Sequence, residues 1–564
     1  MYNRNNTFGF SNQRKEMKIR TWSIMIIFML LLCFLTWKIT NLMYFKSEPL
    51  KTMANAQYTI DEKYGLQYNL IDCNGLDLLN YEVNYYAIID PVDYIRFNEY
   101  TSKYDMQALT ITLRNYNSNY DLEKIKGTGS GEKIRYKIDE ITFDKLKDIK
   151  EVKGFYAYAA NEVIKVKNWK IENLLIELNY DKIGGASALK SADTLEMQIY
   201  NKTKNNKFSK ITFAKGVNGE IADGKIIEPE NNTNVRLTLD KEIQDKVCAI
   251  LHEEEYKKYK QVGVLLMESS NGKIRAMSQK DDSAYNANLG YPSTNGAFPG
   301  SIFKVIVDEA GLDMNLIDNN KEYTINRDYP LEDPYMGQNQ YTLAEALAHS
   351  SNNVFMQLGE TVGLQNIYNY AKKQGMLGKV LNFQQEEIGK FEGDLLNPVV
   401  GDLSQTAIGQ NVRITPLEAI SIPSTIINNG IYVQPSLIDA YVNENNKILE
   451  KITPKITRIL KKETAEKVKL HMMDVVNKGT GIHAAISGMD IGGKTGTTED
   501  GETSDGWFVG FFNLHGKSYS MVVFVDNIDV NIEGKNDEEG GNTAAPLFKK
   551  VVNELNDIMD KRNN

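Results

Sequence analysis

Residues 298–307 read FPGSIFKVIV, and this stretch decides how the rest of the 564-residue chain is interpreted. Pro299 and Gly300 can form a turn that delivers Ser301 to the start of a helix, and the apolar run after it favours that helix. Lys304 would then lie one helical turn along on the same face, where its amine can accept the proton of the serine hydroxyl. The alternative is an N-capping serine beside a solvated lysine, and this segment alone leaves both interpretations open.

The spacing Ser-x-x-Lys also occurs at Ser130, Ser187 and Ser270. At Ser130 and Ser270 a glycine lies inside the motif and disfavours a helix. Ser187 lies in the polar N-terminal part, which carries no companion motif. Ser301 is therefore the candidate nucleophile of the chain, and Lys304 is its candidate general base.

Two more segments carry side chains that could act on a substrate. Residues 349–353 read HSSNN and follow the helical stretch 343–348, although such a run on its own is more typical of a loop or a helix cap. Residues 491–498 read IGGKTGTT and contain the only Lys-Thr-Gly sequence of the chain. Small residues on a strand let a substrate backbone lie close, and a lysine with threonines can hold a carboxylate. A glycine-rich turn is the alternative for this segment.

Several kinds of chemistry lack the residues they need. None of the five histidines lies in H-E-x-x-H or has metal-ligand spacing, and no G-x-S-x-G or Walker sequence is present. A Ser–His–Asp hydrolase built from distant histidines stays open. Cys33, Cys73 and Cys248 fit neither a disulfide framework nor a metal site, and the net charge of −9 argues against nucleic acid. We expect no metal, no cofactor and no nucleic-acid partner.

An apolar segment near the N-terminus indicates a membrane anchor. Residues 21–37 are uncharged and apolar, and residues 39–43 can extend them to the length that spans a bilayer. The basic residues before this run predict a cytoplasmic N-terminus: Arg14, Lys15, Lys18 and Arg20. A cleaved signal peptide is the alternative, because residues 54–56 read ANA, but that site lies far beyond the run. We predict one uncleaved single-pass helix in the cell membrane, with the rest of the chain outside the cell.

The amino-acid composition and the apolar pattern of the part that follows the anchor change near residue 230. Before that point the chain is polar, and short apolar alternations such as residues 85–90 and 108–113 predict strands mixed with short helices. Residues 228–234 have the composition of a linker. Residues 235–239 then alternate like a strand, and Asp240 is expected to cap the helix that follows.

The second half of the chain predicts an α/β domain of the α+β type with an antiparallel sheet. Residues 263–267 and 273–277 flank an Asn-Gly turn and predict a hairpin. Late strands are expected at residues 506–512 and 519–525, after a helical middle part. The predicted organisation is a cytoplasmic tail at 1–20, an anchor at 21–40, an N-terminal domain at 41–230 and a catalytic domain at 235–560.

Taken together and in this order, Ser301-x-x-Lys304, Ser350-x-Asn352 and Lys494-Thr495-Gly496 resemble the signature of the penicillin-binding proteins and serine β-lactamases. Other stretches between 235 and 555 resemble the transpeptidase domain of class B (monofunctional) high-molecular-mass penicillin-binding proteins. The resemblance is fainter at residues 71–75, where Cys73 replaces an arginine that is usual in the family. It implies a transpeptidase domain with an antiparallel sheet and a helical subdomain, preceded by one transmembrane helix and an extended α+β pedestal of the dimerisation type.

The resemblance also implies the activity and the roles of the first two motifs. The chain is expected to be a serine D,D-transpeptidase that cross-links peptidoglycan stem peptides and is acylated by β-lactams. Ser301 would attack the penultimate D-Ala carbonyl with Lys304 as its base. Ser350 would relay the proton to the leaving amine, and Asn352 would orient the substrate amide. Ser351 with Asn353 is the overlapping alternative, which gives a different register for this motif.

The third motif is implied to bind the substrate. Lys494 and Thr495 would stabilise the active site, and Thr495, Gly496 and Thr497 would line the substrate, with Thr497 on its carboxylate. The backbone N–H groups of Ser301 and Thr497 would form the oxyanion hole. The family also implies work beside a SEDS-type glycosyltransferase and other cell-wall machinery.

Four rival interpretations share some of these motifs. A class A β-lactamase uses a glutamate in E-x-x-L-N, and residues 392–397 read EGDLLN, which misses that spacing by one residue. A β-lactam sensor would carry several membrane spans and an H-E-x-x-H sequence. A scaffold with a dead site would not need the three intact motifs. A bifunctional class A enzyme would need a glycosyltransferase domain, and residues 45–230 show no recognisable one.

Overall fold

The computed structural model describes residues 7–45, 59–122, 125, 132–164, 168–182, 185–216, 218–292, 294–329, 338–395, 399, 401–500, 503–529 and 538–563. These residues form two compact units. Unit 1 draws on the ranges 1–65, 82–162 and 208–228, and unit 2 draws on 66–81, 163–207 and 229–564. Two segments of the range 41–230 therefore pack within unit 2, beside the residues of the predicted catalytic domain.

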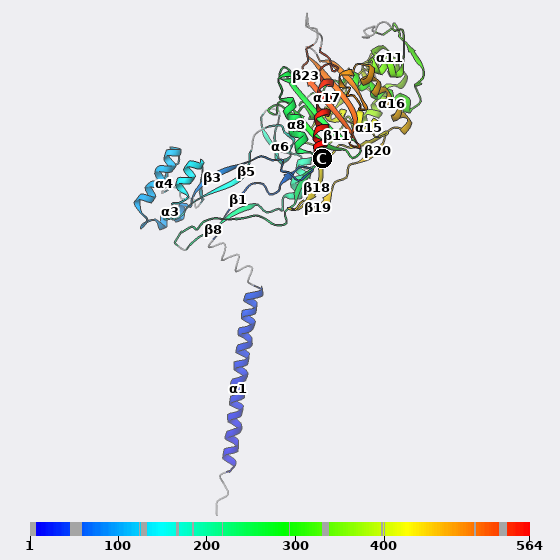
Figure 1. The fold of residues 1–564 in the computed structure, drawn as a ribbon. Helices are drawn as coiled ribbons and strands as arrows, with labels where there is room; N and C mark the ends of the chain where they lie inside the picture. The colour runs from blue at the N-terminus through cyan, green and yellow to red at the C-terminus, as the bar shows by residue number, and fades with distance from the viewer. Residues whose placement is uncertain are drawn as a thin grey trace, which may run out of the picture. The chain divides into compact units, whose positions relative to one another are not determined.

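The predicted apolar helix is present as α1 (Thr7–Thr40), followed by one π-helical turn, η1 (Asn41–Phe45) (Figure 1). Its stretch Lys15–Tyr44 is long and apolar enough to cross a membrane, judged by length and composition. Residues 54–56, on which the cleaved signal peptide would depend, lie outside the described residues.

Unit 1 is built on two small sheets. One has the order β1 (Thr59–Tyr64), β8 (Ser209–Ala214), β9 (Lys225–Ile227), and the other has the order β4 (Ile134–Ile138), β3 (Tyr81–Ile89), β5 (Phe155–Val163). Along the chain, the helices α3 (Pro91–Phe97) and α4 (Lys103–Tyr116) lie between β3 and β4, and α5 (Glu140–Leu146) lies between β4 and β5. The strand expected at residues 85–90 is therefore present as β3.

The strand suggested by residues 108–113 is wrong, because this stretch lies inside α4. Ser102 caps that helix by accepting a hydrogen bond from the Tyr104 amide at 3.2 Å. Leu109 and Leu113 are fully buried one turn apart, whereas Ile111 between them is 55% exposed. The helical spacing of the two leucines therefore determines the structure here, and the apparent alternation through Ile111 does not.

Unit 2 is centred on a five-stranded antiparallel sheet with the order β12-β11-β23-β22-β21. The strands are β12 (Lys273–Gln279), β11 (Gln261–Glu268), β23 (Lys517–Asp526), β22 (Thr503–Leu514) and β21 (Ile491–Asp500). The predicted hairpin at residues 263–277 and both late strands are thereby confirmed. The sheet leaves β21, which carries the Lys-Thr-Gly sequence, at one edge.

Both faces of this sheet are covered. Along β11, Val264 and Leu266 pack into one hydrophobic cluster with α8 (Lys241–Leu251) and α17 (Ala544–Asn563). Leu265 and Met267 point to the opposite face and pack into a cluster with the helical part of unit 2. Because successive residues of a strand face opposite sides, a continuous apolar run serves both layers. Figure 1 shows α17 and α8 lying against the sheet.

The helical part surrounds α9 (Lys304–Asp313), which is buried from its first residue to Leu312. The helices α10 (Leu343–Ala348), α11 (Asn352–Val362), α12 (Leu364–Lys373) and α16 (Lys462–Lys478) pack against α9, and the other helices of this part are α13 (Asp402–Ala407), α14 (Pro416–Ala419) and α15 (Ser421–Ile427). Ser301 does not begin the α-helix as expected, because it lies in a 3-10 turn, η5 (Gly300–Phe303), that leads into α9. The predicted α+β fold with an antiparallel sheet and a helical subdomain is confirmed.

The remaining elements of unit 2 are short. A mixed sheet has the order β19 (Ile448–Lys451), β18 (Ile438–Val442), β10 (Asn234–Leu237), β2 (Leu70–Ile71). The expected cap of α8 is confirmed, since Asp240 Oδ1 accepts a hydrogen bond from the Ile243 amide at 3.4 Å. The strand pairs and small helices are β6 (Asn179–Asp181) with β7 (Ser187–Leu189), β13 (Glu322–Thr324) with β14 (Gln340–Thr342), β15 (Lys390–Phe391) with β16 (Val412–Arg413), β17 (Ile431–Val433) with β20 (Ile456–Arg458), α6 (Ile171–Ile176) and α7 (Leu195–Thr203).

A carboxyl group buried in α9 makes the stability of unit 2 depend on pH. Gln374 Nε2 donates to Glu309 Oε1, and burial raises the pKa of Glu309 well above its usual value. Glu309 Oε2 and Gln374 Oε1 have no hydrogen-bond partner among the described residues. A protonated Glu309 Oε2 would donate a hydrogen bond to Gln374 Oε1, so folding favours the protonated form. The stability of unit 2 therefore falls as the pH rises above the pKa that Glu309 has in the unfolded chain.

We expect Glu309→Gln to raise the free energy of unfolding at pH 8 by about 1–3 kcal/mol, because its amide can always donate to Gln374 Oε1. Thermal unfolding of the full chain in detergent at roughly pH 5 and pH 8 measures the effect, with a higher melting temperature expected for the variant at the higher pH and a smaller difference at the lower pH. A variant that is equally destabilised at both pH values would contradict the protonated pair.

Candidate active site

Four of the side chains singled out in the sequence form one hydrogen-bonded cluster, which contains Lys304, Ser350, Asn352 and Lys494. Ser350 Oγ accepts hydrogen bonds from Lys304 Nζ at 3.2 Å and from Lys494 Nζ at 3.0 Å. Lys304 Nζ also donates to Ser350 O at 2.5 Å and to Asn352 Oδ1 at 2.7 Å. The start of α9, the turn before α11 and the edge strand β21 thus converge through Lys304, Ser350 and Lys494.

The turn before α11 distinguishes the two registers of the second motif. Ser350 adopts a left-handed backbone conformation, with φ of 59°, that directs its hydroxyl and carbonyl groups to Lys304. Ser351 instead caps α11, since its Oγ accepts from the Val354 amide at 3.2 Å. Asn353 donates from Nδ2 to Asn326 O at 2.8 Å. The structure therefore brings Ser350 and Asn352 to the lysine and uses Ser351 and Asn353 for local structure.

Lys494 has an unusual environment for a lysine. Its side chain is fully buried and donates to Ser350 Oγ and to Thr495 O, both at 3.0 Å. Burial lowers its pKa to about 7, although the negative charge of Glu539 acts in the opposite direction. A neutral amine keeps two N–H groups, which is the number that these two hydrogen bonds require. Lys304 is also fully buried, so two positive charges beside one hydroxyl would repel each other.

Two glycines, Gly300 and Gly409, determine the conformation and the packing of the turn that contains Ser301. Gly300 has φ of 54°, and its amide donates to Gly409 O at 3.0 Å. A Cβ on Gly300 would lie 2.8 Å from Thr497 O, and a Cβ on Gly409 would lie 2.1 Å from Gly300 O. Only glycine permits this conformation and this close approach, so the turn is pressed against β21 on one side and Gly409 on the other.

Ser301 is half-buried, whereas the helix that follows is buried. Within the described part of the chain, its Oγ forms no hydrogen bond, so the contact expected between Ser301 and Lys304 is not made in this state. Catalytic hydrogen bonds are often long before a substrate binds. Ser301 is thus partly exposed and lies three residues before the buried Lys304.

The third motif presents one residue to the outside. Of residues 491–498, Thr497 alone is half-buried and the others are buried. Thr497 Oγ1 accepts from the Gly540 amide at 3.1 Å, and Thr495 Oγ1 is 2.7 Å from Thr480 Oγ1. A Cβ on Gly496 would lie 2.6 Å from Pro299 O, so this glycine lets β21 approach the turn before Ser301.

Sequence reasoning missed two of these neighbours, Thr480 and Gly540. No motif marks Thr480, which follows the end of α16. The pair Gly540-Gly541 directly before α17 is a signal of close backbone approach, and it could have drawn attention to this turn. Among the described residues, no group of three or more His, Cys, Asp or Glu side chains could hold a metal ion. The three cysteines are free thiols.

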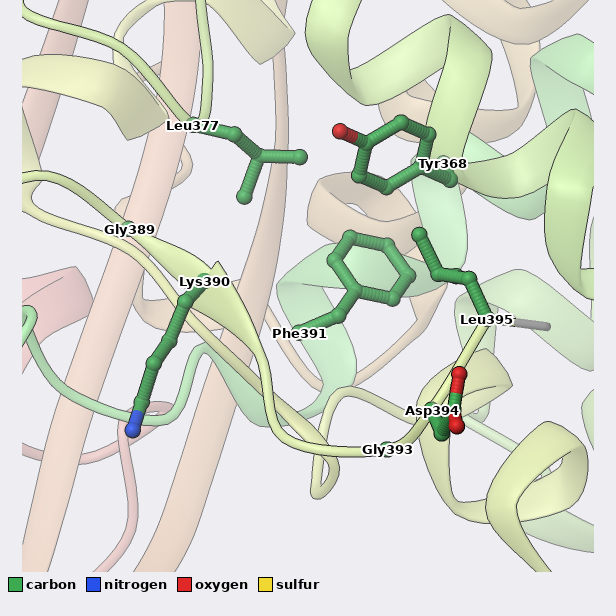
Figure 2. Close-up of a pocket in the computed structure, with 8 residues that line it drawn as sticks. All are labelled: Tyr368, Leu377, Gly389, Lys390, Phe391, Gly393, Asp394 and Leu395. Atoms are coloured by element: carbon green, nitrogen blue, oxygen red, sulfur yellow. The ribbon is translucent and has the colours of Figure 1, made fainter. Parts of the chain in front are cut away.

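A separate cavity of about 420 Å³ is lined by α12 and by residues from the range 377–395. Figure 2 shows Tyr368, Leu377, Phe391 and Leu395 facing the same space, with Lys390 directed away from them. The Phe391 ring lies edge-on to that of Phe303, with 6.1 Å between the centroids. None of the residues that line this cavity belongs to the three motifs. Leu396 and Asn397 of the β-lactamase comparison lie outside the described residues.

Comparison with known proteins identifies the class to which this fold and site belong. Residues 262–553 match the family model described as the penicillin binding protein transpeptidase domain. This match covers more than half of the chain, so the chain belongs to the penicillin-binding protein transpeptidase family. The resemblance drawn from the three motifs is thereby confirmed.

Individual relatives share about a quarter of their aligned residues with this chain. Stage V sporulation protein D of Bacillus subtilis is 27% identical over 372 residues, which is 60% of this chain and 56% of that protein. Peptidoglycan D,D-transpeptidase PbpA of Mycolicibacterium smegmatis is 24% identical over 271 residues, which is 45% of this chain and 54% of that protein. The chain thus spans just over half the length of these curated relatives. A solved peptidoglycan synthetase from Bifidobacterium adolescentis shares the fold, with a TM-score of 0.61, 18% identity and coverage of 90% of this chain and 97% of the other.

Proposed function

We propose that the chain is a serine D,D-transpeptidase that cross-links peptidoglycan stem peptides through an acyl-enzyme on Ser301. Membership of the transpeptidase family supports this activity, as does similarity to a protein named peptidoglycan D,D-transpeptidase. The observation that carries the proposal is the pair of buried lysines that meet at Ser350 Oγ beside the Ser301 turn. Such a cluster can move protons without a histidine or a metal ion.

In the first step Ser301 Oγ bonds to the carbonyl carbon of the penultimate D-Ala, and its proton passes to the neutral amine of Lys304, whose lone pair takes the place of one of the three hydrogen bonds that Lys304 Nζ donates in the structure. The N–H groups of Ser301 and Thr497 stabilise the resulting oxyanion. The C–N bond then breaks, Ser350 gives its proton to the departing nitrogen of the terminal D-Ala, and Lys304 passes the first proton on to Ser350. An amine of a second stem peptide attacks the ester, and the proton it loses returns to Ser301 Oγ through the same lysine.

The contacts around the lysines support this proton route. Lys304, Ser350 and Lys494 form one continuous chain of hydrogen bonds, along which the transfer from Lys304 to Ser350 can take place directly. Asn352 accepts from Lys304 Nζ and would use its own N–H groups to orient the substrate amide. Thr495 and Gly496 lie beside Thr497 along β21, which would receive the substrate as an additional extended segment.

The acylation rate should depend on pH through Lys494, whose pKa burial lowers to about 7. Below that pH, Lys494 gains a charge that opposes proton transfer to the neighbouring Lys304. We therefore expect the acylation rate constant for penicillin to rise about tenfold between roughly pH 6 and pH 8. Lys494→Arg, which stays charged, should be slow and lack this rise, whereas the exposed Lys447→Arg should keep it. A rise near pH 7 that persists in Lys494→Arg would assign the titration to another group.

The lifetime of the acyl-enzyme tests the proposed function against its nearest rival. The full chain in detergent would be labelled with a fluorescent penicillin and followed on a denaturing gel. A transpeptidase keeps the label for a long time, because water deacylates it slowly. Fast loss of label with hydrolysis of the free penicillin would indicate a β-lactamase instead, and the absence of any label would remove the proposed mechanism.

The same proposal places the N-terminus in the cytoplasm and unit 2 outside the cell, with α1 crossing the membrane. The apolar stretch Lys15–Tyr44 and the basic residues that precede residue 21 support this orientation. Residues 41–230 would act largely as a pedestal, and a SEDS-type glycosyltransferase would supply the glycan strands, as the family resemblance implies. Protease added outside intact spheroplasts should digest unit 2 and spare an N-terminal tag; loss of the tag would reverse the orientation.

A further inference from the structure

The turn that leads into α17 lies directly on the strand pair that carries the third motif. Gly496 on β21 is paired with Trp507 on β22. A Cβ on Gly540 would lie 2.2 Å from Gly496 O and 2.4 Å from Trp507 O. A side chain at position 540 would therefore force the turn away from the strands. The glycine permits a contact that brings the Gly540 amide nitrogen to 3.1 Å from Thr497 Oγ1.

This amide determines how the Thr497 hydroxyl can be used. A threonine hydroxyl has one proton to donate and two lone pairs that accept. The Gly540 N–H occupies a lone pair, and it is the one hydrogen bond of Thr497 Oγ1 within the described part of the chain. The hydroxyl proton therefore remains for a ligand. A carboxylate only accepts hydrogen bonds, so it requires such a proton.

The neighbouring threonine of the motif is less accessible to a ligand. Thr495 Oγ1 lies 2.7 Å from Thr480 Oγ1, so these two hydroxyls bond to each other, and Thr495 is buried. Thr497 is half-buried and lies two residues further along the same edge strand. Of the two hydroxyls, the one held by Gly540 is thus the one that can meet a substrate.

We infer that Gly540 is a positioning residue, whose amide holds the Thr497 hydroxyl as a hydrogen-bond donor toward the substrate carboxylate. Gly540 thereby sets the preference of the site for donors that end in a free carboxylate. This inference rests on the proposed function, because it concerns the same acylation of Ser301. It adds a residue from the turn before α17 to the specificity of that reaction.

A double-mutant cycle on the full chain in detergent tests this inference. The measured quantity is the ratio of the second-order acylation rate constants for benzylpenicillin and for its methyl ester, which lacks the carboxylate charge. The variants are Gly540→Ala, Thr497→Val and the two combined, and Thr497→Ser keeps the hydroxyl. Gly378→Ala is the matched control, because a Cβ there meets nothing within 4 Å.

We expect Gly540→Ala and Thr497→Val each to lower the ratio by about tenfold, the usual scale for one hydrogen bond to a charged group. Gly378→Ala and Thr497→Ser should keep the ratio of the unmodified chain. The combined variant should lower the ratio no further than Thr497→Val, since Gly540 acts through that hydroxyl. Equal slowing of both probes in Gly540→Ala, or effects that multiply in the combined variant, would overturn the inference and leave Gly540 a packing role.

Two further outcomes are separable from these. If the unmodified chain reacts with neither probe, the proposed function itself fails, and the inference fails with it. If Gly540→Ala does not fold, the inference is tested in Thr497→Val instead, by measuring the hydrogen exchange of the peptide that contains residues 538–545. Faster exchange of the Gly540 amide than in the unmodified chain supports the hydrogen bond, and unchanged exchange overturns the inference.

Discussion

Ser301→Ala is expected to abolish covalent labelling of the full chain by a fluorescent penicillin. The substitution removes the one atom that can form the ester, so no slower route to the same adduct remains. Because Ser301 Oγ makes no hydrogen bond to the described residues, its loss should leave the melting temperature nearly unchanged. Gel fluorescence and thermal unfolding of the same sample measure the two effects together.

The chain offers matched controls for this experiment. Ser187 and Ser270 have the same spacing to a lysine, but Ser187 lies in β7 and Ser270 in the exposed turn between β11 and β12. Alanine at either position should leave labelling as it is in the unmodified chain. Labelling that survives in Ser301→Ala would show that another residue is the nucleophile.

Lys304→Met should slow acylation by about 10²–10⁴-fold, the range that a general base contributes. Methionine keeps much of the length of the side chain, but it removes the amine that donates to Ser350 O, Ser350 Oγ and Asn352 Oδ1. Stopped-flow measurement of the acylation rate with a chromogenic cephalosporin would give the size of the loss. The reaction should be slow and still take place on Ser301, because the nucleophile remains.

Lys190, a second buried lysine in a Ser-x-x-Lys sequence, serves as a control that separates a loss of chemical rate from a loss of folding. Lys190 donates to Leu174 O and pairs with Glu196, both at 2.8 Å, and its side chain is fully buried. Lys190→Met leaves the Glu196 charge without its partner, so it should destabilise unit 2 by about 3–5 kcal/mol. The acylation rate of the folded protein should not change. A rate loss in Lys190→Met as large as that in Lys304→Met would mean that the effect comes from folding.

Much of the candidate site could be predicted, because each motif places reactive side chains at short, fixed spacings. Lys304, Ser350, Asn352 and Lys494 lie in one hydrogen-bonded cluster although they come from three separate elements, whereas the expected contact between Ser301 and Lys304 is not made. The contact of Gly540 with Thr497 could not be read in the same way. It joins residues far apart in the chain, and it depends on a close backbone approach that only the folded strands reveal.

The fold shows a similar limit. The hairpin of β11 and β12 follows from its Asn-Gly turn, and the late strands follow from their apolar runs. Residues 108–113 misled the prediction, because alternate residues and helical neighbours coincide over so short a stretch. The return of residues 163–207 to unit 2 also has no local signal, since it depends on contacts with later parts of the chain.

The central claim is that this chain joins two stem peptides through Ser301, and product analysis tests it most directly. The full chain in detergent would receive a pentapeptide donor that ends in D-Ala-D-Ala and a second stem peptide with a free amine. Mass spectrometry should find free D-alanine together with a product that contains both peptides and lacks one D-alanine, and Ser301→Ala should form neither. Release of D-alanine to water without the joined product, or the same release by Ser301→Ala, would contradict the account.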